Sequence, residues 1–377
     1  QFDVCQRCHL QGTAVLHKNH TWVDFKPGHK LSDFMDIYLP KYENDESFIM
    51  ASHADRLKQS ACFKGSDISC LSCHNPHKSV HTLPSNYFDD KCMNCHSVCN
   101  DENNTSSCVS CHMPKSSSTD IPHVTITDHK IGIHSVATTE KGKFLGLIAI
   151  NNEQPTYISK AKAYLKQYER FAQNPIYLDS AKFYLDKNKD HKNIAHLFIK
   201  YYYLKEDFTS LVNYSMQISD FQIPKEELGL TFARIGESCL VLDMSSKALQ
   251  YYNLAHKHSS SNLTYQIKIG VIHIDNNQLD SAQIIFENVL LQYSKNKEAL
   301  LNLGYVFILQ KQYEEAKKML EYLIQIEPDY LLAYENMVLL YLRQNNSVVA
   351  KSYLNKILEI EPNYKIQSNI INSFIIN

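Results

Sequence analysis

The chain has 377 residues, of which 44% are hydrophobic and 21% charged, so it has enough apolar side chains for two or three folded domains and is not a disordered polymer. Its 38 basic and 40 acidic residues give a net charge of −2, which argues against a nucleic acid partner. The longest apolar run, 144–150, is interrupted by Gly146 and is far shorter than the ~20 residues that span a bilayer, so no membrane span is expected. Only 10 glycines occur, well below the usual share of about 7%, and no glycine-rich nucleotide-binding motif is present.

Four copies of the pattern Cys-x-x-Cys-His lie in the first third of the chain. Their thiols are Cys5 and Cys8, Cys70 and Cys73, Cys92 and Cys95, and Cys108 and Cys111, and their histidines are His9, His74, His96 and His112. Two thiols at this spacing can bind the two vinyl groups of one porphyrin, and the following histidine then reaches the iron. The pattern predicts four covalently bound haem c groups, with these histidines as proximal iron ligands.

Zinc binding and dithiol redox chemistry are the alternatives for these cysteines. The motifs at 70–73 and 92–95 are separated by 18 residues, a spacing that also suits a tetrahedral zinc site. Zinc gives no reason for a histidine after every second cysteine, and a thioredoxin-like pair would not occur four times. Haem is the preferred interpretation, and a zinc-stabilised adaptor protein is the alternative.

Each haem iron needs a second axial ligand unless that position is open for chemistry. Of the 18 histidines, 13 lie in the first 134 residues, and nine of these stand outside the motifs. We expect the distal ligands to be His53, His77, His123 and His129, with His20 in reserve, and the remaining four to be ordinary surface or core residues: His17, His29, His81 and His134. With nine candidates for four positions, every iron can have two histidine ligands.

The short spacing of the last three motifs predicts a compact cluster. Only residues 75–91 separate the second motif from the third, and only residues 97–107 separate the third from the fourth. So small a segment cannot build an ordinary apolar core, so the haem groups are expected to take its place. The first haem is expected at one edge of this cluster.

The chain from about residue 157 onward has a helical pattern with a period of 34 residues. Small residues recur at this period: Gly236, Gly270 and Gly304, and Ala248, Ala282, Ala316 and Ala350. This is the tetratricopeptide period, in which small residues let the two helices of a hairpin cross closely. Large residues are expected in the core between them: Tyr252, Phe286, Leu320 and Leu354. Clear repeats are predicted at 229–364, with units starting near 229, 263, 297 and 331, two degenerate units before them at 157–228, and a terminal helix at 365–376.

The fold class expected from these patterns is mainly α. A loop-rich tetrahaem cytochrome c domain at 1–137 is followed by a linker at 138–156, where glycine, asparagine and proline are concentrated. A tetratricopeptide-like α-solenoid then occupies 157–377.

Several short segments of the first third carry a family resemblance. They are Asp-Phe-Lys-Pro-Gly at 24–28, Ser-Ala-Cys at 60–62, Cys-His-Asn-Pro-His at 73–77, Cys-His-Met-Pro-Lys at 111–115 and Thr-Asp-His-Lys-Ile at 127–131. With them, residues 5–134 resemble the haem domain of multihaem c-type cytochromes that carry a C-terminal tetratricopeptide array. The resemblance implies an exported electron-transfer protein. Members of that family often have further haem motifs upstream, so we expect a signal peptide or more to precede Gln1.

The expected function is electron transfer through closely spaced haems, with no catalytic residue. The partners would be redox proteins, and the helical array would serve docking or self-association, including a head-to-tail polymer that forms an extracellular cytochrome filament. The location would be the periplasm, the cell surface or the outside, where a disulfide between Cys62 and Cys99 could also persist. The alternative enzyme is a multihaem reductase of small nitrogen or sulfur oxyanions with one open haem iron.

Overall fold

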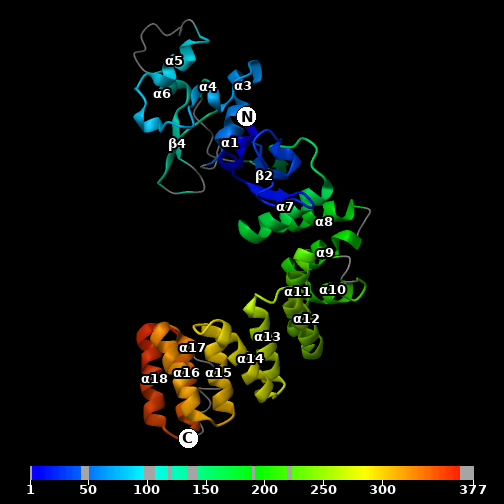
Figure 1. The fold of residues 1–377 in the computed structure, drawn as a ribbon, viewed down its shortest axis with the longest axis vertical. Coiled ribbons are helices and arrows are strands. Elements are labelled where there is room, and N and C mark those ends of the chain that lie inside the picture. The colour runs from blue at the N-terminus through cyan, green and yellow to red at the C-terminus, as the bar shows by residue number, and fades with distance from the viewer. Residues whose placement is uncertain are drawn as a thin grey trace. The chain divides into compact units, whose positions relative to one another are not determined.

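The structure is a computed structural model that describes residues 2–43, 51–96, 107–117, 121, 123–134, 142–188, 192–218 and 223–365 (Figure 1). The chain divides into two compact units, Gln1–His191 and Lys192–Asn377. Cys99 and all but the first residue of the predicted terminal helix at 365–376 lie outside the described residues. None of the described helices is long and apolar enough to cross a membrane.

The first unit contains a three-stranded antiparallel sheet. Its strands are β1 (Thr13–Leu16), β2 (Met35–Tyr42) and β5 (Phe144–Ala149), in the order β1-β2-β5. In the central strand, Tyr38 is aligned with Thr13 on one side and with Ala149 on the other. Strand β5 comes from the stretch expected to be a linker, because its apolar run pairs with β2 and buries Leu147.

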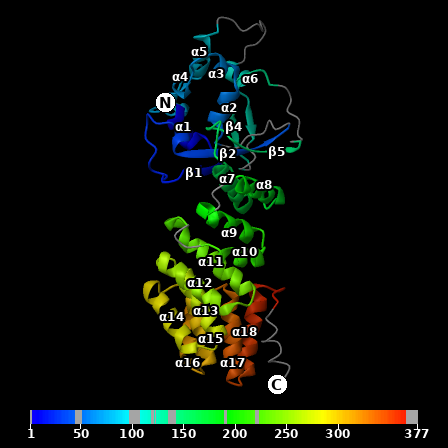
Figure 2. The same ribbon diagram turned by 90° about the vertical axis from the view of Figure 1, so that its right-hand side faces the viewer.

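Two helices that were expected to begin the solenoid belong to the first unit (Figure 2). Helix α7 (Tyr157–Arg170) packs on β1 and β5, and α8 (Pro175–Asp186) pairs with α7. Polar contacts join α7 to the sheet: Thr13 Oγ1 donates to Gln167 Oε1 at 2.6 Å, and the Tyr164 hydroxyl accepts from the Leu147 amide at 2.9 Å. The boundary between the compact units therefore follows His191, whereas the sequence pattern placed the start of the second domain at 157.

The rest of the first unit consists of short helices joined by loops. The helices are α1 (Phe2–His9), α2 (His53–Gln59), α3 (Ala61–Gly65), α4 (Cys70–Cys73), α5 (Tyr87–Met93) and α6 (Cys108–His112), with 3-10 turns at Leu31–Asp33 and Val80–Thr82. A small hairpin is formed by β3 (Lys115–Ser117) and β4 (Thr125–Thr127). The buried apolar cluster next to α1 is small: Leu10, Leu31, Met35, Ile37 and Ala54.

The second unit is a row of helical hairpins. After a 3-10 turn at Lys192–Ile194 come α9 (Ala195–Leu204) and α10 (Phe208–Ser215). Four longer hairpins follow: α11 (Lys225–Val241) with α12 (Ser245–His258), α13 (Leu263–Asp275) with α14 (Leu279–Gln292), α15 (Lys297–Leu309) with α16 (Tyr313–Ile326), and α17 (Leu331–Arg343) with α18 (Ser347–Ile360). The first helices of the last three hairpins begin at 263, 297 and 331, the residues predicted from the period.

Each glycine at the 34-residue spacing faces a large side chain of the partner helix. A Cβ atom on Gly270 would lie 2.6 Å from the Phe286 ring, and one on Gly304 would lie 2.9 Å from Leu320. The four alanines of the ladder are fully buried. The small residues therefore provide the close approach that the hairpins need.

A second 34-residue ladder lies in the turns between the paired helices. Asp243, Asn277, Lys311 and Asn345 all have a left-handed backbone conformation, with φ between 56° and 62°. Asparagine and aspartate tolerate this conformation better than most residues, but Lys311 does not share that preference. Because the residue type varies along this ladder, the turn geometry is less visible in the sequence than the glycines and alanines are.

Replacing Gly270 by alanine is expected to destabilise the second unit by about 1–2 kcal/mol. Alanine gains up to about 1 kcal/mol of helix propensity, but forcing a methyl group against the fully buried Phe286 ring costs roughly 1–3 kcal/mol. The measurement is denaturant unfolding followed by helical circular dichroism. Gly65→Ala is the control, since no atom lies within 4 Å of its new Cβ. A Gly270→Ala protein as stable as the parent would contradict the close-packing explanation.

Candidate functional site

The four Cys-x-x-Cys-His motifs lie on or beside short helices. The first motif ends α1, the second forms α4 with His74 directly after it, and the fourth forms α6. In the third, Cys92 lies in α5, and Cys95 and His96 follow its end. Residues three apart share one face of a helix, so the two thiols of a helical motif point to the same side. Ser69 begins α4 by accepting from the Leu71 amide and forms a capping box with Ser72.

Four histidines from distant parts of the chain form a cluster in the first unit. The ring centres of His9 and His53 are 5.3 Å apart, those of His53 and His129 are 4.7 Å apart, and those of His74 and His129 are 6.1 Å apart. His9 and His74 are predicted proximal ligands, and His53 and His129 are predicted distal ligands. Folding therefore brings residues 9, 53, 74 and 129 together from α1, α2, the end of α4 and the loop after β4.

Backbone carbonyl groups orient two of the predicted iron ligands. His129 Nδ1 donates to the carbonyl of Thr127 at 3.0 Å, and His112 Nδ1 donates to that of Gly132 at 3.2 Å. Because a carbonyl oxygen only accepts, Nδ1 carries the proton of each neutral ring and Nε2 keeps its lone pair. Metal-ligating histidines usually make this second contact, which sets the tautomer and orients the ring.

Burial keeps the clustered imidazoles neutral. It lowers the pKa of His53 to about 4, with a further contribution from the positive charge that His129 and His9 would carry. Burial also lowers the pKa of His74 and of His129. His53 Nδ1 is buried and has no hydrogen-bond partner among the described residues. Neutral rings with an unused nitrogen are the form of histidine that binds a metal.

A buried ion pair lies beside this cluster. Arg56 Nε donates to Asp128 Oδ1 at 2.8 Å and Arg56 Nη2 donates to Oδ2 at 2.5 Å, and the two residues are 4% and 3% exposed. The Lys130 amide also donates to Asp128 Oδ1, at 2.9 Å. Burial raises the pKa of Asp128, but the hydrogen bonds from Arg56 and Lys130 outweigh it and leave the pKa below its ordinary value. This pair joins α2 to the loop after β4.

The motif thiols are not activated nucleophiles. Burial, together with the neighbouring Cys5, raises the pKa of Cys70 to about 12, and burial raises the pKa of Cys92 to about 11. The pKa of Cys73 is also raised by burial. A catalytic or thioredoxin-like cysteine has a lowered pKa instead. These three thiols are therefore protonated at neutral pH.

The remaining predicted ligands lie apart from the four-histidine cluster. His77, His96 and His123 are exposed, and within the described part of the chain none of them makes a ring contact with the cluster. The reserve candidate His20 lies against Phe34, with its Nδ1 3.7 Å from the Asp24 carboxylate. No group of three or more His, Cys, Asp or Glu side chains among the described residues is arranged to hold one metal ion.

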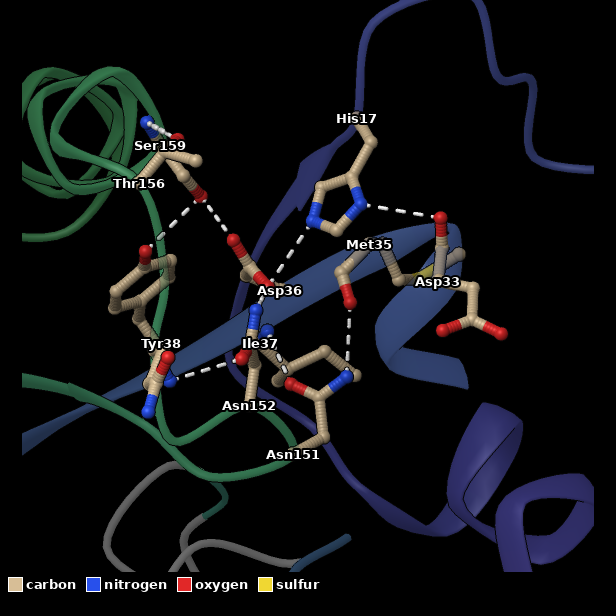
Figure 3. A network of polar contacts seen from close by, with 11 residues as sticks. His17, Asp33, Met35, Asp36, Ile37, Tyr38, Asn151, Asn152, Thr156 and Ser159 are labelled. Carbon is tan, nitrogen blue, oxygen red and sulfur yellow. Dashed lines mark hydrogen bonds and ion pairs between the residues drawn. The ribbon is translucent and has the colours of Figure 1, made fainter. Parts of the chain in front are cut away.

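A second polar network joins β2 to α7 (Figure 3). The carboxylate of Asp36 is fully buried and accepts from the Ser159 hydroxyl, from Asn152 Nδ2 at 2.7 Å, and from His17 Nε2 at 3.1 Å. The Tyr38 hydroxyl donates to Ser159 Oγ at 3.0 Å. His17, which we expected to be an ordinary residue, is thus one of three groups that hold a buried carboxylate. No sequence motif marked Asp36, because its partners are up to 123 residues away in the chain.

The end of the chain matches the family model of the tetratricopeptide repeat over residues 273–323 and 307–368. The chain carries tetratricopeptide repeats. This confirms the repeat family predicted from the 34-residue period. No curated protein matches the chain.

Several solved structures are similar to this chain at low sequence identity. A tetratricopeptide repeat protein from Parabacteroides merdae is 15% identical with a TM-score of 0.45, over 57% of this chain and 84% of that one. The MamA protein is 16% identical with a TM-score of 0.39, over 46% and 94%. YrrB, described as a tetratricopeptide protein with an unusual peptide-binding site, is 15% identical with a TM-score of 0.35, over 57% and 99%.

Proposed function

We propose that this protein is an exported multihaem c-type cytochrome whose tetratricopeptide array docks other proteins. The observation that carries the proposal is the fourfold Cys-x-x-Cys-His motif. The gathering of two motif histidines with His53 and His129 supports it. The cofactors would be four covalently bound haem c groups, which supply single-electron transfer when bound.

The residues of the first unit fit such groups. An imidazole nitrogen lies about 2 Å from a metal that it binds, so two rings on opposite sides of one iron have centres about 6 Å apart. The ring centres of His74 and His129 are 6.1 Å apart. An axial pair needs only two histidines on each iron, so it does not require three side chains to converge on one point. The buried and partnerless Nδ1 of His53 is a further sign of a ring whose surroundings lack a group.

The protein's own residues would hold and tune the groups. The motif cysteines would carry the thioether bonds, and His9, His74, His96 and His112 would be the proximal ligands. The carbonyl groups of Thr127 and Gly132 would keep two ligand rings in the correct tautomer and raise their basicity. Since this role requires no catalytic acid or base, the redox partner would be met by docking alone.

The tetratricopeptide repeats place this chain among proteins that act through protein–protein interaction. The array would bind a redox partner or another copy of the chain, and a head-to-tail polymer is one form that such self-association would take. Attachment of c-type haem takes place outside the cytoplasm, so we propose a periplasmic, surface or extracellular location.

The test is a visible spectrum of the purified protein, oxidised and then reduced, with haem, iron and zinc measured per chain and carbon monoxide added last. We expect four covalent haems per chain with low-spin spectra that carbon monoxide leaves unchanged. A high-spin iron that binds carbon monoxide would support a reductase instead. A protein with zinc and no haem would be an adaptor, and the proposal would fail.

A further inference from the structure

We infer that the buried Arg56–Asp128 ion pair is a positioning device that holds His53 and His129 as distal ligands of the first two haems. His53 would face His9 across the haem of Cys5 and Cys8, and His129 would face His74 across that of Cys70 and Cys73. The ring distances within these two pairs are 5.3 and 6.1 Å. This inference rests on the proposed function.

Each half of the ion pair is directly coupled to one of the two histidines. Arg56 lies three residues after His53 in α2, so both side chains share one face of the helix. Asp128 directly precedes His129, and its carboxylate accepts from the Lys130 amide, while His129 Nδ1 donates to the Thr127 carbonyl. A rotation of α2 or of the loop after β4 would therefore move one imidazole relative to the other.

The geometry of the pair suits a positioning role better than a purely stabilising one. Burying two charges is costly, and apolar residues of similar size often give equal or greater stability. A bidentate arginine–carboxylate contact, by contrast, sets both the distance and the relative orientation of the two groups. The gain from such a contact lies in geometry, and the geometry here is that of two neighbouring imidazoles.

The same loop also reaches the fourth motif. The Asp128 amide donates to the Pro114 carbonyl at 2.9 Å, and the Gly132 amide donates to the His112 carbonyl at 3.2 Å. The carbonyl of Gly132 in turn accepts from His112 Nδ1. The ion pair therefore orders a loop that contacts ligands of the first, second and fourth haems.

The test uses Asp128→Asn in the full chain, produced with haem attachment. All four haems should remain covalently bound, because no thiol is changed. One or two of them should change from low-spin to high-spin and bind carbon monoxide. His53→Ala and His129→Ala provide the reference spectra for the loss of each ligand, and the Asp128→Asn spectrum should contain the high-spin bands of one or both.

The matched control is Asp186→Asn, which breaks the exposed Lys182–Asp186 ion pair of α8 and should leave all haems low-spin. The double variant Arg56→Met/Asp128→Leu covers the case in which Asp128→Asn does not fold, because it replaces the pair with apolar packing. If the pair only stabilises the fold, this double variant stays low-spin, and the inference is overturned. A folded Asp128→Asn protein with four low-spin haems would also overturn it while leaving the proposed function intact. A parent protein without haem would remove both.

Discussion

Replacing Cys108 and Cys111 together by alanine is expected to lower the covalent haem content from four to three per chain. The two thiols lie on α6 and carry the only covalent attachment expected for the fourth haem. His112 would remain, but a single axial contact does not keep a haem through denaturing purification. The other three motifs lie on or beside separate helices, so their haems should be unaffected. The measurement is the haem content of the denatured protein, taken together with iron per chain.

The control for this experiment is Cys239→Ala. Cys239 is fully buried in α11 and belongs to no motif, so its removal should leave the haem content unchanged. Equal haem content in the double alanine variant and the parent would show that the fourth motif does not attach haem. A loss of bound zinc from that variant, with no haem in either protein, would favour the zinc adaptor.

Replacing Asp36 by alanine is expected to destabilise the first unit by about 3 kcal/mol or more. The Asp36 carboxylate is fully buried and accepts three hydrogen bonds, from His17, Asn152 and Ser159. Alanine leaves these donors without an acceptor, and each buried donor left unpaired costs about 1–3 kcal/mol. The same change frees α7 from β2, so we expect the sheet and α7 to separate at lower denaturant concentration.

The measurement is the free energy of unfolding of the full chain, taken from denaturant titration of the transition that reports the first unit. The control is Asp33→Ala, at an exposed residue that contributes only its backbone carbonyl to the network. That carbonyl is retained in the variant, so the change in free energy should stay within about 0.5 kcal/mol. Equal effects of the two substitutions would show that the Asp36 network does not stabilise the unit.

The helical repeats were predictable because their contacts are local in sequence. The glycine and alanine positions of each hairpin meet a partner in the same hairpin, as Gly270 meets Phe286. A pattern that repeats every 34 residues therefore carries most of the packing information. The left-handed turn residues escaped the sequence analysis because Lys311 and Asn277 differ in type while their backbones are alike.

The domain boundary was less predictable, because it depends on pairing between distant segments. The residues of β5 look like a linker with a short apolar run, and only pairing with β2 makes them a strand. Helix α7 has the pattern of a solenoid helix, but its Gln167 and Tyr164 contact the sheet. Neither contact has a local signal, since each partner lies in another part of the chain.

The sequence by itself determined the four haem-attachment motifs, the family of the repeats and the starts of three hairpins, because each depends on residues close together along the chain. Only the tertiary structure decided which histidines lie beside which motif, that Arg56 and Asp128 form a buried pair, and that Asp36 joins the sheet to α7. These features consist of contacts across 72 to 123 residues. Such contacts form only when the chain folds back on itself, and a buried polar residue leaves no periodic pattern by which it could be recognised beforehand.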